Sequence, residues 1–487
     1  MSRLRRVLEL FRRPLGRLAC LLLGIAFIAA AQQSAPPPPA AAAPPPASAQ
    51  NEDFLKAADE VLAEMSKLIS LPVLKPLKKS MRSREEIRDY LLRKMDEDKD
   101  ADKRYADQKV LEKFALIPKN YPLDREMVKI LTEQIAGLYD PDSEEFFIAD
   151  WNDPSDQRMV MSHELTHALQ DQHFHIEKWG DAAKPDDDAE LARDAVLEGS
   201  AMAAMLDYIL RDQGRTVRDL GTIDPELLMG DPESSPELAH APKVIQDELL
   251  FPYVSGTTFT QRLLQVGSGW PDFYKVFAKP PVSTQQIMHP NLYLAGVAPP
   301  PLTLPATAGA LPAEWKKLDE NKMGEFGVLE ILKQFLTKDR AADLAASWSS
   351  DRYAIFEDQK TKRTLLLFRL RLANDGEAAR FFGAYSEALE LKYQERSELL
   401  RRPNFFSFDT PDGGVFLRCF ESDCFTMEGA GREIFDRLTH EMGWPAGPAA
   451  PKKPQKSGIK AADSSAWPLG PRGNPRDAGP PMRPMAP

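Results

Sequence analysis

Apolar residues recur along the chain with two different spacings, and the change between them divides it. Over residues 51–297 most apolar side chains lie three or four positions apart, as in helices that bury one face. Over residues 312–444 such stretches mix with strand-like runs, for example residues 364–372, where Phe368, Leu370 and Leu372 alternate with Arg369 and Arg371. We therefore predict an α+β protein, with a mainly helical domain over residues 51–297 and a small α+β domain over residues 312–444.

The first domain is predicted to consist mainly of helices. Helical spacing runs through residues 51–120, Ser83 begins a second helix within them, and Leu123 begins another. Residues 136–149 contain two short β-prone runs around the turn sequence Asp140-Pro141-Asp142-Ser143. This pattern predicts a small edge hairpin directly before the next helix.

A Pro-rich stretch at residues 297–311 marks the boundary to the second domain. We predict a helix, two strands, a helix, a three-stranded meander and a last helix after it. The expected ranges are 323–346, 352–357, 364–372, 375–394, 405–408, 415–420, 424–428 and 433–442. This domain carries no cluster of catalytic residue types, so we expect a packing or substrate-binding accessory domain.

Residues 159–175 (MVMSHELTHALQDQHFH) are predicted to form one helix, because neither Gly nor Pro interrupts them. His163 and His167 are four positions apart, so both imidazoles project from the same side of this helix. Two imidazoles on adjacent turns can bind one Zn²⁺. Glu164, one helical step round, can reach a water on that metal and accept its proton as general base.

The alternative for this histidine pair is a solvated helix face. Only seven histidines occur in 487 residues, however, and four of them lie between positions 163 and 175. This concentration, on a helix of the right phase, favours a metal site. His173 and His175 complete no second ligand set, and we expect them at the surface or just outside the ligand shell.

A third ligand is predicted in residues 195–206 (AVLEGSAMAAML), a nearly all-apolar helical run whose only charge is Glu198. An isolated buried carboxylate is strongly disfavoured unless it is paired or binds a metal. Glu198 is therefore the expected ligand. The alternative is an ion pair with an arginine such as Arg193 or Arg211.

Two neighbours of Glu198 carry further expectations. Gly199 costs about 1 kcal/mol relative to Ala inside a helix, which suggests the close approach of another backbone. Asp194 lies four residues before Glu198 on the same face and is a candidate for orienting a ligand.

These residues resemble a known group. HELTH followed by Leu197-Glu198-Gly199-Ser200-Ala201 is similar to the gluzincin metallopeptidases, in which a Glu completes a His/His/Glu zinc site. The longer string HELTHALQDQ, with STQQIMHP at residues 283–290, resembles poorly characterised exported metallopeptidase-like proteins of bacteria and archaea. That second similarity spans roughly residues 82–293.

The sequence departs from the gluzincin pattern in two places. Thirty residues separate His167 from Glu198, more than in typical gluzincins, and the excess fits an inserted acidic loop at residues 179–188. Position 202 is Met, where thermolysin-like enzymes place an Asp four residues after the Glu. These departures leave the ligand assignment unchanged. The identity of the residues that surround the ligands, however, cannot be taken from the gluzincin pattern.

The resemblance implies a zincin-like fold in which His163, His167 and Glu198 hold one Zn²⁺ per chain. Glu164 then activates a bound water for attack on a peptide carbonyl. In zincin folds an edge strand near the metal helix pairs with an extended substrate. By resemblance, residues 146–148 are the candidate strand, and an ordinary structural hairpin is the alternative.

Peptide hydrolysis also needs a group that stabilises the oxyanion of the tetrahedral intermediate, usually a His, Tyr or Arg near the metal. Four residues beyond Glu198 are candidates: His240, Tyr253, His289 and Tyr293. We favour His289 as the second catalytic residue, because it lies in the stretch that resembles the exported group. A structural role for this lone histidine is the alternative.

The N-terminus indicates export. Residues 1–31 combine a basic segment, a 14-residue apolar run and Ala29-Ala30-Ala31 as a cleavage site, the features of a signal peptide. We expect a periplasmic or secreted protein, with the membrane as a partner only if this segment is retained as an anchor. Residues 32–50 are predicted to form a Pro/Ala-rich linker, a semi-rigid extended spacer, and the Pro/Gly-rich tail at residues 445–487 is predicted to be disordered.

Charge and cysteine content agree with this assignment. The net charge of −11 argues against nucleic-acid binding. Of three cysteines, Cys20 lies in the signal segment, while Cys419 and Cys424 flank a predicted hairpin turn. We predict a disulfide between the latter two, as export to an oxidising compartment permits.

The sequence thus predicts an exported zinc metallopeptidase that acts on a peptide or protein substrate. One alternative is a non-catalytic, zinc-containing envelope scaffold or binding protein. The other is a helical envelope protein in which the histidine motif is accidental and binds no metal.

Overall fold

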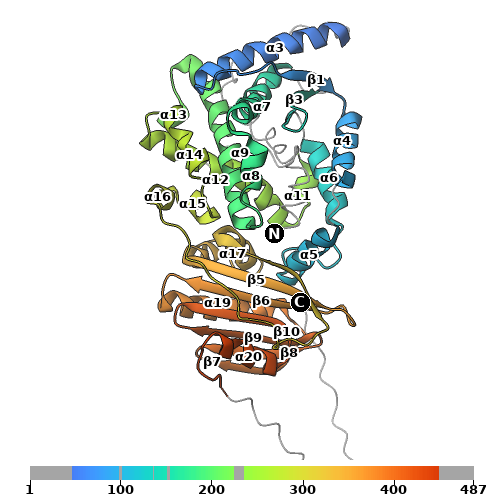
Figure 1. Cartoon of the computed structure of the whole chain (residues 1–487), viewed down its shortest axis with the longest axis vertical. Helices are drawn as coiled ribbons and strands as arrows, with labels where there is room; N and C mark the ends of the chain where they lie inside the picture. The colour runs from blue at the N-terminus through green and yellow to red at the C-terminus, as the bar shows by residue number, and fades with distance from the viewer. Residues whose placement is uncertain (1–46, 98–100, 135–136, 151–153, 224–234, 449–487) are drawn as a thin grey trace, which may run out of the picture. The chain divides into compact units, whose positions relative to one another are not determined.

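The computed structural model describes residues 47–97, 101–134, 137–150, 154–223 and 235–448. It confirms the α+β class: a mainly helical region with a three-stranded sheet precedes a seven-stranded antiparallel sheet with its own helices (Figure 1). The predicted signal segment and nearly all of the predicted tail lie outside the described residues. None of the helices within those residues has the length and apolar character that a membrane span requires.

The helical region begins with α3, inside the last four residues of the predicted linker. Ala-rich sequence without Pro after Pro46 permits a helix there. Its elements are α3 (Ala47–Leu68), β1 (Lys78–Arg82), α4 (Arg84–Glu97), α5 (Ala101–Lys113), α6 (Leu123–Gln134), β2 (Gly137–Asp140), β3 (Glu145–Ala149), α7 (Pro154–Phe174), α8 (Ile176–Asp181), α9 (Asp187–Leu210), η1 (Arg211–Gln213), η2 (Val217–Asp219), α11 (Pro236–Ala239), α12 (Lys243–Val266), α13 (Trp270–Phe273), α14 (Lys275–Ala278), α15 (Thr284–Met288) and α16 (Pro290–Leu294).

The small sheet has the order β1-β3-β2, with β1 parallel and β2 antiparallel to β3. The predicted hairpin is therefore confirmed as β2 and β3, but β1 was not predicted. Because β1 pairs along one side of β3 and β2 along the other, residues 146–148 form the centre of the sheet. They are not an edge strand open to a substrate, and that expectation was wrong.

The C-terminal sheet has the order β4-β5-β6-β10-β9-β8-β7. Its elements are β4 (Trp315–Asn321), α17 (Gly324–Lys333), α18 (Lys338–Ala345), β5 (Trp348–Asp358), β6 (Thr364–Leu372), α19 (Asp375–Lys392), β7 (Ser397–Arg402), β8 (Phe405–Thr410), β9 (Gly413–Phe420), β10 (Asp423–Ala430) and α20 (Arg432–Glu441). The alternation predicted for β6 separates two cores: Leu366 and Phe368 pack on one face, and Leu367 on the other.

The helices of this region occupy those two faces. Phe381 of α19 belongs to the first core and Phe435 of α20 to the second. The predicted helix over residues 323–346 is two helices, because Thr337 takes an extended conformation between α17 and α18. The disulfide between Cys419 and Cys424 is present, across the β9–β10 hairpin.

The first turn of α9 joins the two regions. Within the helical region, the Oδ1 atom of Asp188 accepts hydrogen bonds from the backbone N and the Oγ1 of Thr284 in α15, at 2.9 and 2.6 Å. Gly324 lies so close to Asp188 that an added Cβ would come within 1.8 Å of this Oδ1. Asp187 N donates to Oδ1 of Asn321 at 3.2 Å. The helix that carries Glu198 is thus anchored to the C-terminal region at its start.

Candidate metal centre

Helix α7 positions the histidine pair. It starts at Pro154, a residue suited to a first helical turn, and it ends before His175, whose φ of 50° takes the chain out of the helix. Met161, Leu165 and Leu169 form a buried apolar stripe along it. The opposite face, which carries His163 and His167, is buried as well.

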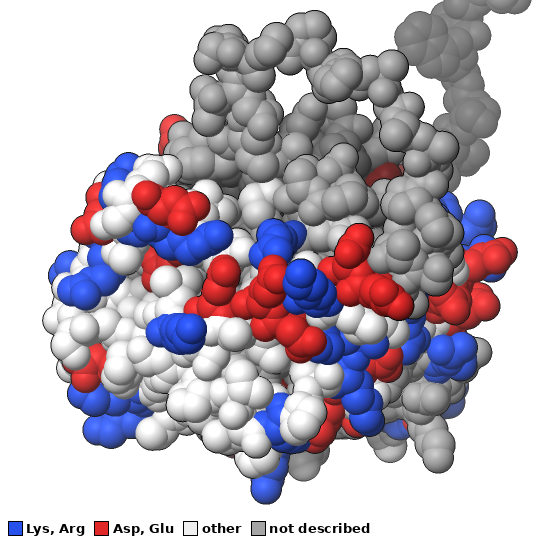
Figure 2. Space-filling view, turned by 90° about the horizontal axis from the view of Figure 1, so that it is seen from above, with Lys and Arg blue, Asp and Glu red and all other residues white. Residues whose placement is uncertain are grey.

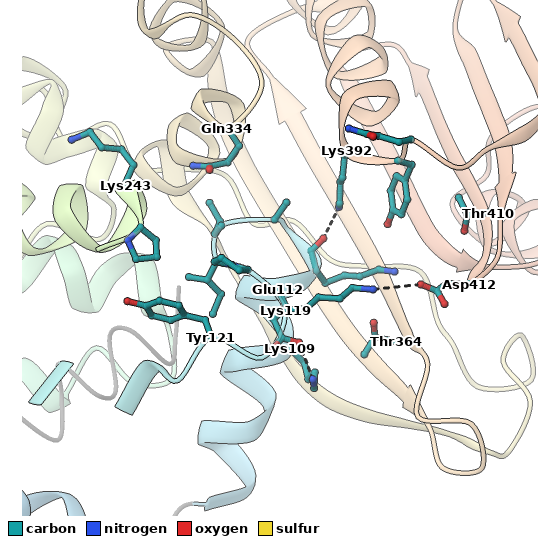
Figure 3. A pocket seen from close by; sticks show the side chains of 18 of the residues that line it. Lys109, Glu112, Lys119, Tyr121, Lys243, Gln334, Thr364, Lys392, Thr410 and Asp412 are labelled. Atoms are coloured by element: carbon teal, nitrogen blue, oxygen red, sulfur yellow. Dashed lines mark hydrogen bonds and ion pairs between the residues drawn. The ribbon is translucent and has the colours of Figure 1, made fainter. Parts of the chain in front are cut away.

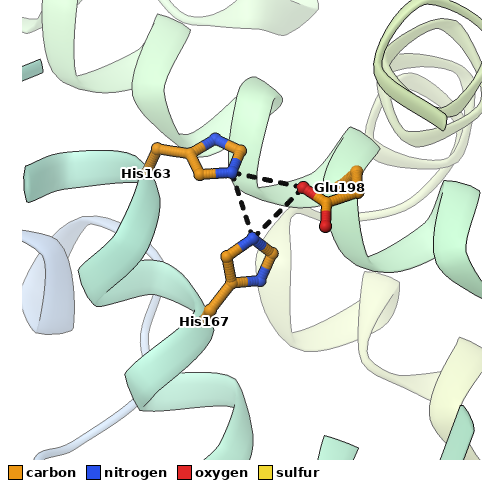
Figure 4. A group of neighbouring side chains, drawn as sticks. All are labelled: His163, His167 and Glu198. Atoms are coloured by element: carbon orange, nitrogen blue, oxygen red, sulfur yellow. Dashed lines mark hydrogen bonds and ion pairs between the residues drawn. The ribbon is translucent and has the colours of Figure 1, made fainter. Parts of the chain in front are cut away.

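His163, His167 and Glu198 converge, as Figure 4 shows. The two Nε2 atoms lie 3.0 Å apart, and each is 3.3 Å from Oε2 of Glu198. All three side chains are buried. A buried His/His/Glu triad that could hold a metal ion is therefore present, formed by two turns of α7 and the middle of α9.

The spacing of the three ligand atoms suits a tetrahedral metal. With metal–ligand bonds of about 2.0–2.1 Å, two ligand atoms on a tetrahedral Zn²⁺ lie about 3.3 Å apart. The observed separations of 3.0–3.3 Å agree with that value. Two imidazole nitrogens and a carboxylate oxygen are also a donor set that zinc commonly takes.

The charge of Glu198 is favoured by its neighbours. Burial raises the pKa of the Glu198 carboxyl, but the adjacent imidazoles of His167 and His163 outweigh this effect and hold the pKa well below its usual range. The alternative ion pairs are not formed: the guanidinium of Arg193 donates to the carbonyl of Trp179, and that of Arg211 to the carbonyl of Tyr208.

A close contact between two helices places Glu198. The added Cβ of an alanine at Gly199 would lie 1.9 Å from the carbonyl carbon of Gly256 in α12. In return, a Cβ at Gly256 would lie 2.0 Å from the oxygen of Ala195. The expectation of a close backbone approach at Gly199 is confirmed, and this contact sets the position of α9 beside α12.

Glu164, which follows the triad residue His163 in the sequence, is held by the small sheet. Its Oε2 accepts a hydrogen bond of 2.9 Å from the backbone N of Tyr139 in β2. This approach requires a glycine two residues earlier, because a Cβ at Gly137 would lie 2.6 Å from Val160 of α7. The outer edge of β2, rather than β3, therefore faces the metal helix.

The residues after HELTH hold α7 in place. Gln170 donates to Oγ of Ser200 in α9 at 2.8 Å, and Asp171 accepts from the hydroxyl of Tyr139 at 2.8 Å. Gln172 accepts from the backbone N of Leu74 at 2.7 Å. These structural roles explain the polar end of the string HELTHALQDQ, which the sequence reasoning left unassigned.

The candidates for oxyanion stabilisation are separated by the fold. The Tyr253 ring lies beside the triad, with its centroid 6.3 Å from that of His163. His289 instead binds Glu325 of α17, at 2.8 Å between Nε2 and Oε1. Tyr293 donates to the carbonyl of Lys279, and His240 contacts the carbonyl of Pro236. The contacts of His289 give no support to the role predicted for it.

A small apolar cluster adjoins the metal centre on the side of Tyr253. Met202, Met205 and Tyr253 pack together apart from the main core. Met202 stands one turn after Glu198, where the comparison with thermolysin-like enzymes leads one to look for an Asp. The triad therefore has an apolar neighbour at this position.

The predicted acidic loop at residues 179–188 is shorter than expected. Trp179 belongs to α8, and Asp187 and Asp188 form the buried first turn of α9. Residues 182–186 form the turn that connects the two helices. The loop expectation therefore holds only for these five residues, because Asp187 and Asp188 begin a helix, where carboxylates are favoured by the helix dipole. Asp186 caps it by accepting from the backbone N of Ala189.

Comparison with known proteins concerns the C-terminal region. A family model described as a domain of unknown function (DUF8575) matches residues 313–420. No curated protein and no solved structure matches the chain. The matched segment contains none of the triad residues. The assignment of the metal centre therefore depends on the side chains of the triad itself.

Proposed function

We propose that this protein is an exported zinc-dependent peptidase. The observation that carries the proposal is the placement of Glu164: a potential general base lies one residue from a ligand of the buried triad, and a backbone hydrogen bond from Tyr139 holds its carboxylate. A purely structural zinc site has no use for such a base and normally takes a fourth Cys or His ligand. The Cys419–Cys424 disulfide supports export, since such bonds persist in oxidising compartments.

Each residue has a defined role in the proposal. His163, His167 and Glu198 hold the ion, which when bound would polarise a peptide carbonyl and lower the pKa of water. Glu164 accepts the proton of the attacking water and passes it to the leaving amine. Tyr253, in place of His289, is assigned to donate a hydrogen bond to the oxyanion.

Burial of the triad favours a second candidate, a zinc-containing protein without catalysis. His163 and His167 are fully buried, and Glu198 is only 2% exposed. A polypeptide substrate reaches these groups only after part of the surrounding chain moves aside. In a non-catalytic protein the ion would instead stabilise the packing of α7 against α9.

The test is metal content and proteolysis measured on the same preparations. We expect about one zinc per chain in the mature protein by elemental analysis, and its loss in His167→Ala. Cleavage of a mixed peptide library should fall about 10²–10⁴-fold in Glu164→Gln, because proton transfer by the base is lost. The Glu164→Gln protein should keep its zinc.

The outcomes separate the two candidates. Zinc that binds stoichiometrically without any Glu164-dependent cleavage would support the non-catalytic protein. A well-folded chain that takes up no zinc, even when it is supplied, would exclude both. If another divalent metal binds at the same stoichiometry, the assignment of the site holds and only the identity of the ion changes.

A further inference from the structure

A second functional candidate is a cavity of about 1100 Å³ outside the metal centre. It is lined by the end of α5 and the segment after it, the start of α12, the end of α19 and the turn after β8 (Figure 3). Its volume is slightly above the range of about 300–1,000 Å³ that is usual for small-molecule sites.

The lining of this cavity is basic, although the chain as a whole is acidic. Five lysines and three carboxylates line it: Lys109, Lys113, Lys119, Lys243 and Lys392, with Glu112, Glu395 and Asp412. On the face drawn in Figure 2, by contrast, lysines and arginines lie beside acids. The excess of lysines over acids in this concave site differs from the charge distribution on that face.

Two of the three carboxylates are already engaged. Glu112 binds Lys109 at 2.8 Å and also accepts from Gln108 and from the backbone N of Asn120. Asp412 lies 3.9 Å from the ammonium of Lys119. Glu395 is exposed. The acids of the lining thus compensate the lysines around Lys113, and none of them forms an ion pair with Lys113 itself.

Lys113 is the lysine whose charge is least compensated. It is half-buried, and none of the described residues forms an ion pair or hydrogen bond with its ammonium group. Glu428, the acid that most favours the charged form of Lys113, binds Lys392 at 2.6 Å. Burial lowers the pKa of Lys113 to about 8, the charge of Lys392 adds to this effect, and Glu428 opposes it. A partly desolvated cation without a partner is unfavourable until an anion joins it.

We propose that this cavity binds a small polyanion, a molecule that carries phosphate or carboxylate groups, with Lys113 as its central contact. Lys119 and Lys392 add positive charge beside it, and Gln334, Thr364 and Thr410 supply neutral polar groups. Phosphate and carboxylate are the groups that lysine ammonium ions bind in proteins. This site does not depend on the metal centre or on peptidase activity.

The test is thermal unfolding of the full chain against increasing phosphate or succinate, with ionic strength held constant by NaCl. A ligand that binds only the folded state raises the midpoint in a saturable way. The half-saturating concentration should rise at least about tenfold in Lys113→Met, which removes a charged hydrogen-bond donor. The matched control Lys316→Met changes an exposed lysine of β4, outside the cavity, and should behave like the wild type.

Several results would decide the matter. Saturable stabilisation by phosphate alone identifies a phosphate ligand, and by succinate alone a carboxylate ligand; either supports the site. No saturable shift with either anion overturns the proposal. An equal shift in wild type and Lys113→Met also overturns it, since general salt effects act on both. If Lys113→Met does not fold, Lys119→Gln replaces it, and an unchanged half-saturating concentration there counts against the site.

Discussion

Glu198 could be identified as a ligand from the sequence because all its neighbours within residues 195–206 are uncharged. It is the only charge in an apolar helical run, and burial of an unpaired carboxylate is so costly that a partner had to exist. The structure supplies two imidazoles at 3.3 Å. At the residue scale, one carboxylate in an otherwise apolar segment was therefore enough to predict a member of the triad.

Replacement of Glu198 tests its assignment as a ligand. Glu198→Gln keeps the size of the side chain but removes its negative charge, so zinc affinity should fall by more than the roughly 10–100-fold that loss of an outer-shell partner costs. Competition with a chromogenic chelator measures this affinity. Glu190→Gln is the matched control, a buried glutamate of the same helix outside the triad. Equal affinities in wild type and Glu198→Gln would refute the ligand assignment.

Tyr253 is a residue whose importance could not be read locally. Its ring approaches His163 from a helix that lies far along the chain. Tyr253→Phe should reduce kcat about 10²–10³-fold with zinc retained, as loss of one oxyanion donor does. Steady-state kinetics and elemental analysis check this, with Tyr274→Phe as the control, since the Tyr274 hydroxyl only contacts the carbonyl of Ile69. A kcat that does not change would contradict the role assigned to Tyr253.

At the scale of elements, the crossing of α9 and α12 matters most. Both helices carry a glycine where their backbones touch, Gly199 and Gly256. The crossing lies one residue from Glu198, so the contact that packs the two helices also determines where the Glu198 carboxylate lies relative to the two histidines. Gly199 therefore positions a ligand without contacting the metal.

Gly199→Ala should destabilise the protein although Ala is the better helix former. Its Cβ would meet Gly256 at 1.9 Å, and overpacking of this kind costs about 1–3 kcal/mol. The urea midpoint of the metal-free protein measures the effect. Gly383→Ala in α19 is the control: it meets nothing within 4 Å and should stabilise by up to about 1 kcal/mol. The same midpoint for Gly199→Ala as for wild type would mean that the helices are farther apart.

Three strands were not predicted from the sequence, for a common reason. β1, β4 and β7 have mostly half-buried or exposed residues and no apolar alternation. They are strands because a partner strand offers backbone hydrogen bonds: β3 for β1, β5 for β4 and β8 for β7. Such edge strands leave little hydrophobic signal, and without β1 the hairpin's second strand was mistaken for an edge.

At the scale of the whole molecule, burial and the surrounding charges determine the pKa of Lys113 in the basic cavity. Lys113 is surrounded by groups from distant segments: Glu428 and Asp412 raise its pKa, whereas Lys392 and Lys119 lower it. Burial outweighs them all and lowers the pKa from 10.5 to about 8. The folded state therefore carries an unfavourable charge at neutral pH.

This balance predicts a pH dependence of stability. Between pH 8 and 10.5 the unfolded chain binds the Lys113 proton and the folded chain does not, so the contribution of Lys113 to the free energy of unfolding rises with pH. The difference in urea midpoint, wild type minus Lys113→Met, should increase from pH 8 to pH 10 in buffer without polyanions. A constant or falling difference would show that burial of Lys113 is not the dominant effect.

What the sequence determined by itself was everything that depends on neighbours along the chain. Helix phase placed His163 and His167 on one side, an isolated charge marked Glu198, and alternation identified β6. These features come from the geometry of a single helix or strand, so they need no partner. The α+β class and the disulfide followed from the same local patterns.

Only the tertiary structure decided which segments meet. It placed Tyr139 against Glu164 and Tyr253 beside His163, and it gave His289 a partner in the C-terminal region. It also gathered the lysines around Lys113 from three separate segments, residues 109–119, the start of α12 and the end of α19. These contacts join residues many positions apart, and their energies depend on burial and on charges that no local pattern contains.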